Sequence, residues 1–339
     1  MANSAAVAKA KAVYGTLFKK EDYENLVHRN SVSTAVSYLK GTPRYAAVFS
    51  GYDGAALHRG QIEQLLGKSV FESYCRIRRF SSSSGAVMDF YLKEREAEQL
   101  SKAIAAVAAG TQERFYLAFP DYLMNRVGFD PKAAAQAKNG KALLAALRGT
   151  VFEKPLTPLL SGEEIDLNRC VTAVHACLLS WTFTELNKSC RGKELERLKS
   201  FFLRRADSEN LLTCYRLKRF FDEDSERIKT LILPYRYRVK PREIDDALSA
   251  QEPSEALLRL LTERCVSRNI AIEDDSPETG IARENYEYFR HRLALTSNEA
   301  EALYALMILL DTERTNLQKI IEGIRYSVPP QEIEKFIIA

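Results

Sequence analysis

The chain has 339 residues, of which 46% are hydrophobic and 28% charged, and its formal net charge is +4. This composition is typical of a globular protein with a large core, and so small a net charge excludes a whole surface built to bind polyanions. No run of about 18 apolar residues occurs, which excludes an ordinary membrane-spanning helix. The N-terminus shows no signal-peptide pattern and the six cysteines form no Cys-x-x-Cys pair, so a reducing cytosol is the expected compartment.

Helical periodicity begins near the N-terminus and continues along the chain. Residues from about 5 to 40 favour two or three helices, and a further helix is predicted over 61–80. The serines of 81–84 predict a flexible turn between helices. A long helix over about 86–110 follows it.

The remaining elements are also predicted to be helices. Their expected ranges are 131–148, 166–190, 193–220, 251–268, 284–295 and 297–326, with a short helix from 331 and an acidic loop at 273–280. Thr296 and Glu299 have the form of a capping box at the start of the last long helix. Sustained apolar–polar alternation is absent throughout, so the predicted fold class is all-α.

A polar motif recurs on three of the long helices. An acidic residue, two others, an Asn or Gln and a Leu stand in this order at 96–100, 207–211 and 313–317, with the amides 111 and 106 residues apart. The second and third copies are followed by Val-x-Pro-x-Glu-Ile at 239–244 and 328–333. We therefore expect three pseudo-repeated helical units, with approximate boundaries 1–115, 116–225 and 226–339.

Two interpretations of this motif stay open. Residues i and i+3 share one helix face, and a mid-helix Asn costs several tenths of a kcal/mol against Ala, roughly, so some contact should compensate it. That contact is either a hydrogen bond that fixes the packing of a neighbouring segment, or a polar ring that lines a shared concavity. The candidate lining or partner-contact residues are Glu96, Gln99, Asp207, Asn210, Arg216, Glu313, Asn316 and Glu322.

Charges differ along the chain and between the copies. Residues 191–243 carry 15 Lys/Arg and 9 Asp/Glu, whereas 244–339 carry 10 and 18. This difference fits surfaces for different partners, and it fits solvated faces of either sign equally well. Arg216 stands where the third copy has Glu322, so an asymmetric partner is expected. Nucleic acid is not expected, because acidic residues interrupt the basic stretch.

Motifs for catalysis or cofactor binding are absent. The sequence contains no phosphate loop, no dinucleotide-binding glycine pattern and no nucleophile elbow, and its four histidines have no partner at i+4. We therefore expect no catalytic residue, cofactor or metal.

The residues around the motif resemble a known family. The segment 313–326 is similar to the C-terminal signature of the C subunits of bacterial and archaeal V-type (A-type) ATPases, whose counterpart in the eukaryotic vacuolar enzyme is the d subunit. Residues 207–218 resemble the family's central motif, and residues 20–39 its opening helices. The sequence departs from the family at Gln99, where Asn is usual, and in lacking a Gly-rich turn after Arg216.

The resemblance implies a non-catalytic rotor subunit without a cofactor. It implies a funnel of three helical units with pseudo-threefold symmetry, present as one copy on the cytoplasmic mouth of the membrane ring of proteolipid subunits. The funnel would receive the foot of the central rotor shaft and transmit torque between ATP turnover and ion or proton transport, cytoplasmic and peripheral to the membrane. The alternative is a free-standing helical scaffold that binds protein or nucleic acid, and an α-helical hydrolase is a weaker one.

Overall fold

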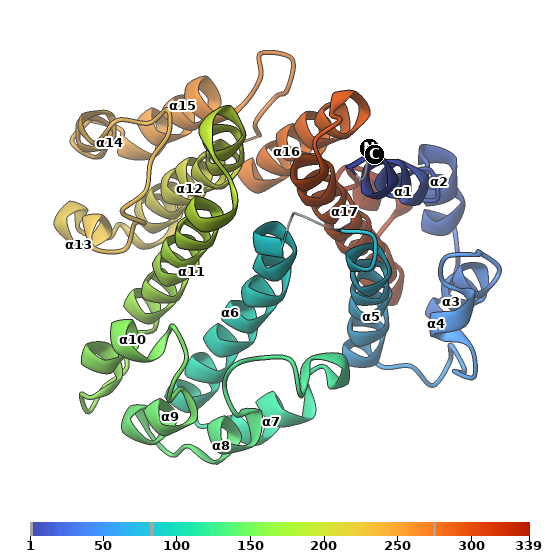
Figure 1. Ribbon diagram of the computed structural model, residues 1–339, viewed down its shortest axis with the longest axis horizontal. Helices are drawn as coiled ribbons and strands as arrows, with labels where there is room; N and C mark the ends of the chain where they lie inside the picture. The colour runs from blue at the N-terminus through green and yellow to red at the C-terminus, as the bar shows by residue number, and fades with distance from the viewer. Residues whose placement is uncertain (1–2, 82–84, 274–275) are drawn as a thin grey trace. The chain divides into compact units, whose positions relative to one another are not determined.

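The computed structural model describes residues 3–81, 85–273 and 276–339 (Figure 1). Regular structure in these ranges is entirely helical, without a strand, which confirms the all-α fold class. The elements are α1 (Asn3–Tyr14), α2 (Lys20–Val27), α3 (Val32–Lys40), α4 (Ala46–Phe49), α5 (Arg59–Arg78), α6 (Gly85–Ala109), α7 (Gln112–Leu117), η1 (Asp121–Leu123), α8 (Pro131–Gln136), α9 (Gly140–Ala146), α10 (Glu153–Leu160), α11 (Leu167–Ser189), α12 (Gly192–Phe221), α13 (Ser225–Lys229), α14 (Pro241–Leu248), α15 (Pro253–Cys265), α16 (Pro277–Leu295), α17 (Glu299–Arg325) and α18 (Pro330–Glu334).

The chain folds into two compact units. One combines Met1–Met88 with Ala282–Ala339, and the other is Asp89–Ile281. The first unit thus joins the beginning and the end of the sequence. The division into 1–115, 116–225 and 226–339 stays a prediction.

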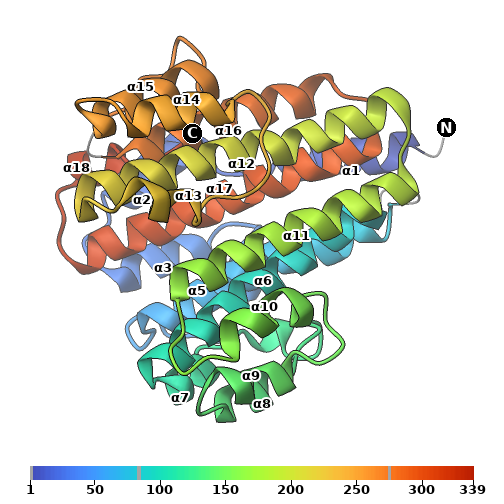
Figure 2. The same cartoon turned by 90° about the vertical axis from the view of Figure 1, so that its left-hand side faces the viewer.

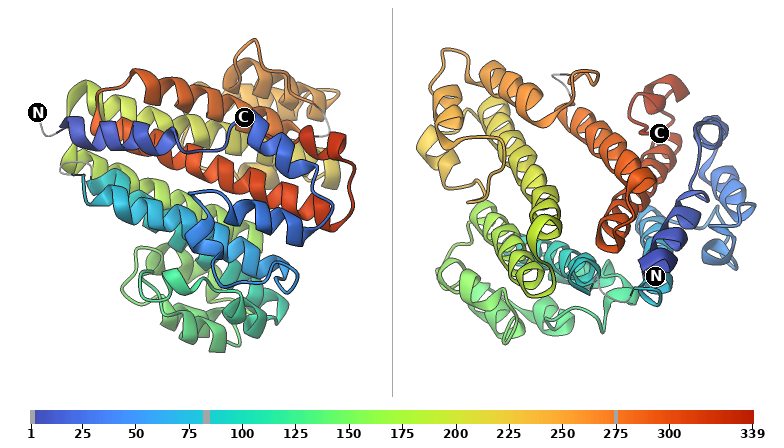
Figure 3. Two further views of the ribbon diagram at one scale, coloured as in Figure 1. Left: turned by 90° about the vertical axis from the view of Figure 1, so that its right-hand side faces the viewer. Right: turned by 45° about the horizontal axis from the view of Figure 1, so that its top comes forward.

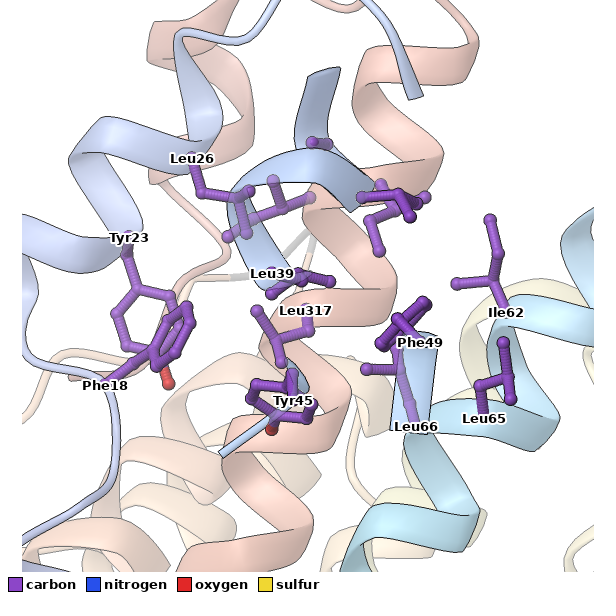
Figure 4. Packing of buried hydrophobic residues seen from close by; sticks show 14 of the residues in the cluster. Phe18, Tyr23, Leu26, Leu39, Tyr45, Phe49, Ile62, Leu65, Leu66 and Leu317 are labelled. Carbon is purple, nitrogen blue, oxygen red and sulfur yellow. The ribbon is translucent and has the colours of Figure 1, made fainter. Parts of the chain in front are cut away.

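Helix α17 is the axis of the first unit. Helices α1 and α5 run alongside it, and α2, α3 and α18 also pack against it (Figure 3). These helices cover the apolar stripe of α17, in which Leu303, Leu310 and Leu317 are all buried. Figure 4 shows Leu317 among side chains that the first 66 residues supply, including Tyr45 and Leu66.

Helix α12 is the axis of the second unit. It runs beside α11, and α13, α14 and α15 gather around its C-terminal half (Figure 2). Leu211 and Tyr215 share a buried cluster there with Val239, Ile244 and Leu261. The helices around the C-terminal half of α12 therefore follow it directly in the sequence.

The predicted cap of the last long helix is wrong. Helix α17 begins at Glu299, its N-cap is Asn298, and the Asn298 side chain accepts the Glu301 N–H at 2.9 Å. Asn298 and Glu301 have the same spacing as Thr296 and Glu299, and an Asn oxygen is among the best N-cap acceptors. Thr296 instead accepts the N–H of Asn298 at 3.0 Å, just outside the helix.

Two other predicted segments differ from the structure. The helix over 131–148 is broken into α8 and α9, because Asn139 caps a new helix and Gly140 lies so close to α10 that a Cβ would be 2.4 Å from the Leu160 carbonyl oxygen. The acidic loop at 273–280 is already helical from Pro277 onward. The predicted serine turn at 82–84, and residues 274–275 of that loop, lie outside the described residues.

Candidate functional site

The third copy of the motif is buried, and its polar groups bind other segments of the same chain. The Glu313 carboxylate accepts the Phe18 N–H at 2.5 Å and the Tyr45 hydroxyl at 2.7 Å, and it forms an ion pair with Arg44 at 2.6 Å. One turn later, the Asn316 amide donates to the Ile338 carbonyl at 2.6 Å and accepts the Ile338 N–H at 3.1 Å. The two side chains thus hold the N-terminal segment and the C-terminal tail against one helix.

The second copy holds the segment that returns after α12. Asp207 accepts three successive backbone N–H groups, from Tyr237 at 3.0 Å, Arg238 at 2.6 Å and Val239 at 3.3 Å. Asn210 accepts the Leu233 N–H at 2.6 Å and donates to the carbonyls of Leu233 and Tyr235, both at 3.2 Å. The carboxylate and the amide therefore fix one register of this segment.

The first copy is also buried, although its amide residue is Gln99. Glu96 is 3% exposed and Gln99 4%. Lys93 donates to one carboxylate oxygen of Glu96 at 2.8 Å, and a Cβ on Gly128 would lie 2.8 Å from the other oxygen. The absence of a side chain at Gly128 therefore leaves room for the Glu96 carboxylate in its present position. Gly128 follows Glu96 by 32 residues, as Val239 follows Asp207.

Burial sets the charge states around Glu313. Desolvation, and then the negative charge of Glu313, raise the pKa of Tyr45 well above its ordinary value, so its hydroxyl stays a donor. Desolvation alone would lower the pKa of Arg44, but Glu313 and Tyr45 together outweigh it and raise that pKa. Tyr45 is therefore a neutral phenol donor beside the Arg44–Glu313 ion pair.

The two remaining candidates lie at the surface. The Arg216 side chain is 53% exposed and pairs with Glu278 at 2.6 Å. The Glu322 side chain is 31% exposed and pairs with Arg59 at 2.5 Å. The eight candidates thus separate into six buried side chains, the half-buried Glu322 and the exposed Arg216, and the last two each have an ion-pair partner.

Nearly the whole chain matches one known protein family. The family model described as ATP synthase (C/AC39) subunit matches residues 6–336. The chain belongs to the ATP synthase (C/AC39) subunit family. It is also similar to the C subunit of the A-type ATP synthase of Thermococcus onnurineus (strain NA1), with 25% identity over 344 residues, 97% of this chain and 88% of that protein.

Membership in the C/AC39 family makes this chain a non-catalytic accessory subunit of a rotary complex, an A/V-type ATP synthase. Its described residues contain no group of three or more His, Cys, Asp or Glu side chains that could hold a metal ion. A search of the same ranges finds no helix with the length and hydropathy needed to cross a membrane.

Several residues that contact the motif in this C/AC39 chain were not predicted from the sequence. Arg44, Tyr45 and Phe18 complete the Glu313 cluster from positions more than 260 residues away, and no spacing rule connects them to the motif. Gly128 carried a weak signal, since it lies in the break between predicted helices. What it accommodates, the carboxylate of Glu96, becomes visible only in the fold.

Proposed function

We propose that this chain is a central-stalk subunit of the rotor, which seats the rotor shaft on the membrane ring of proteolipid subunits and transmits torque between them. The observation that carries the proposal is the family match over residues 6–336, which spans nearly the whole chain. Such a subunit would stand at the cytoplasmic side, peripheral to the membrane, as one copy per complex.

The helical architecture supports a part that carries load. The longest helices, α12 and α17, are each fixed to neighbouring segments by a buried carboxylate and a buried amide. Hydrogen bonds that a buried carboxylate accepts from successive backbone N–H groups specify a register, which an apolar contact does not. A subunit that transmits torque needs segments that do not slide along its long helices.

We also propose the pseudo-threefold repeat and the funnel. Each motif helix ends at a residue with left-handed backbone: Gly110 with φ 67°, Asp222 with φ 44° and Ser327 with φ 55°. These residues follow the motif amides at 99, 210 and 316 by 11, 12 and 11 positions. These nearly equal distances support a common origin for the three helices.

Within this funnel, Arg216 and Glu322 are the proposed shaft contacts among the eight candidates. Both are at the surface, and their charges are opposite at equivalent motif positions. The six buried candidates would brace the wall behind them. An asymmetric shaft is the partner that such unequal charges suit.

The experiment is reconstitution of the purified complex in vesicles, with and without this subunit. We expect the complete complex to form an ion gradient on ATP addition. Without the subunit, ATP hydrolysis by the head should continue while no gradient forms. Undiminished ion pumping in its absence would overturn the proposal, as would failure of the chain to co-purify in detergent with the head and the ring.

A further inference from the structure

Two consecutive phenylalanines at the end of α12 are left in solvent. Phe220 is 65% exposed and Phe221 74%. Together they expose on the order of 300 Å² of apolar surface, since a Phe side chain presents about 150–250 Å². This area is comparable with the largest apolar patch on a typical monomer, which is often functional.

The backbone holds this pair of rings in a fixed position. Asp222, a non-glycine residue, adopts the left-handed conformation with φ 44° and ends the helix directly after Phe221. The Glu223 N–H then closes the helix on the Leu217 carbonyl at 3.1 Å. The ring of Phe220 also lies edge-on to buried Tyr215, with 6.5 Å between the centroids. The Phe220 ring, held in this way, loses little freedom when a partner covers it.

The charges around the phenylalanines have both signs. Lys218 and Arg219 stand in the last turn of α12, and neither forms an ion pair within the described ranges. Asp222, Glu223 and Asp224 follow at once. Anionic lipid headgroups would attract the two cations but repel the three carboxylates, so a membrane surface fits this end poorly. Aromatic anchors beside Arg are typical of contacts between proteins.

The end of α17, in the first unit, has a similar arrangement. Tyr326 is 67% exposed, follows Arg325 and precedes the left-handed Ser327. Tyr326 comes ten residues after Asn316, as Phe220 comes ten residues after the motif amide of α12. Two of the three motif helices thus carry an exposed aromatic side chain at this offset, and α6 has Ala109 there.

We propose that Phe220 and Phe221 are anchor residues that insert into an apolar pocket on another protein subunit of the same complex. The pocket would be bordered by carboxylates that face Lys218 and Arg219. This inference rests on the proposed function in one respect, because it takes its partner from the rotary complex. It adds the site and the chemistry of the contact.

The test compares two variants. One carries both Phe220→Ser and Phe221→Ser, and the control carries Leu117→Ser alone. Leu117 at the end of α7 is a matched control in the same unit, with the same 74% exposure as Phe221. Both variants should melt like the wild type, because they change exposed side chains. The phenylalanine variant should bind the purified remainder of the complex at least about tenfold more weakly, the loss typical of an interface anchor. The control should bind like the wild type.

Two further measurements identify the partner. A double variant Lys218→Glu, Arg219→Glu should associate more slowly, with the difference reduced at high salt. A photo-crosslinking amino acid in place of Phe220 should label a neighbouring subunit in the detergent-purified complex.

The outcomes separate the two proposals. If the wild-type chain itself does not join the complex, the proposed function is wrong and this inference fails with it. If the wild type joins and the phenylalanine variant joins equally well, the anchor proposal alone is wrong. Crosslinks to lipid or to a second copy of this chain would also overturn it.

Discussion

Replacement of Glu313 by Ala is the sharpest test of the buried polar cluster. The Glu313 side chain is 2% exposed and that of Arg44 6%. The substitution would leave the guanidinium buried without its carboxylate, and the Phe18 N–H and the Tyr45 hydroxyl without their acceptor.

The expected loss is large. Removal of one partner from a buried ion pair costs about 3–5 kcal/mol, and each orphaned buried donor about 1–3 kcal/mol. Because water can enter the vacated volume, these losses do not add fully. We expect the free energy of unfolding of the first unit to fall by about 4–6 kcal/mol, which for a unit of roughly 150 residues lowers Tm by about 10–20 °C.

The assay is thermal and urea unfolding of the full chain, followed by circular dichroism. Glu287→Ala is the matched control, since it breaks an exposed pair with Arg290 at 2.6 Å and should cost less than about 1 kcal/mol. The double variant Arg44→Met, Glu313→Leu should recover much of the loss, because it removes both charges. If Glu313→Ala costs no more than Glu287→Ala, the reasoning from burial is wrong.

Three further predictions follow from named contacts. Asn316→Leu should lower the free energy of unfolding by about 1–3 kcal/mol in denaturant titrations, because the backbone of Ile338 loses both partners. The Lys240 N–H, with Arg264, lowers the pKa of Glu243. The ionised Glu243 carboxylate therefore stabilises the fold above the unfolded pKa of about 4.3, and this stabilisation is lost as pH falls through the folded pKa. Melting curves of Glu243→Gln and the wild type should thus differ at pH 7 and converge at about pH 3. Reversing both charges, Arg216→Glu with Glu322→Lys, breaks two partly exposed pairs and should change Tm little, but should slow association with the purified shaft; unchanged binding would place both outside that interface.

The helices themselves were largely predictable from sequence. The helix expected over 193–220 is α12, Gly192–Phe221, and that over 297–326 is α17, Glu299–Arg325. Long apolar stripes and the absence of alternation determine such elements locally. The cap of α17 was misplaced because Thr296 and Asn298 both stand three residues before a Glu, and the sequence does not rank the two.

The partners of the motif were not predictable, because they depend on where distant segments return. Asn210 contacts a segment 23 residues later, whereas Glu313 contacts Phe18 and Tyr45, near the other end of the chain. A motif gives the chemistry that a position needs, here donors for a carboxylate. It does not say which part of the chain supplies them.

The buried motif and the proposed partner surface are carried by different residues. Asp207 and Glu313 have their oxygens occupied by donors of the chain itself, so neither carboxylate is available to a second protein without breaking the fold. Exposed side chains such as Arg216 and Phe221 do not hold a buried segment of the chain in place. Substitutions at the buried motif should change stability first, and binding only as its consequence, whereas substitutions at the exposed positions should change binding alone.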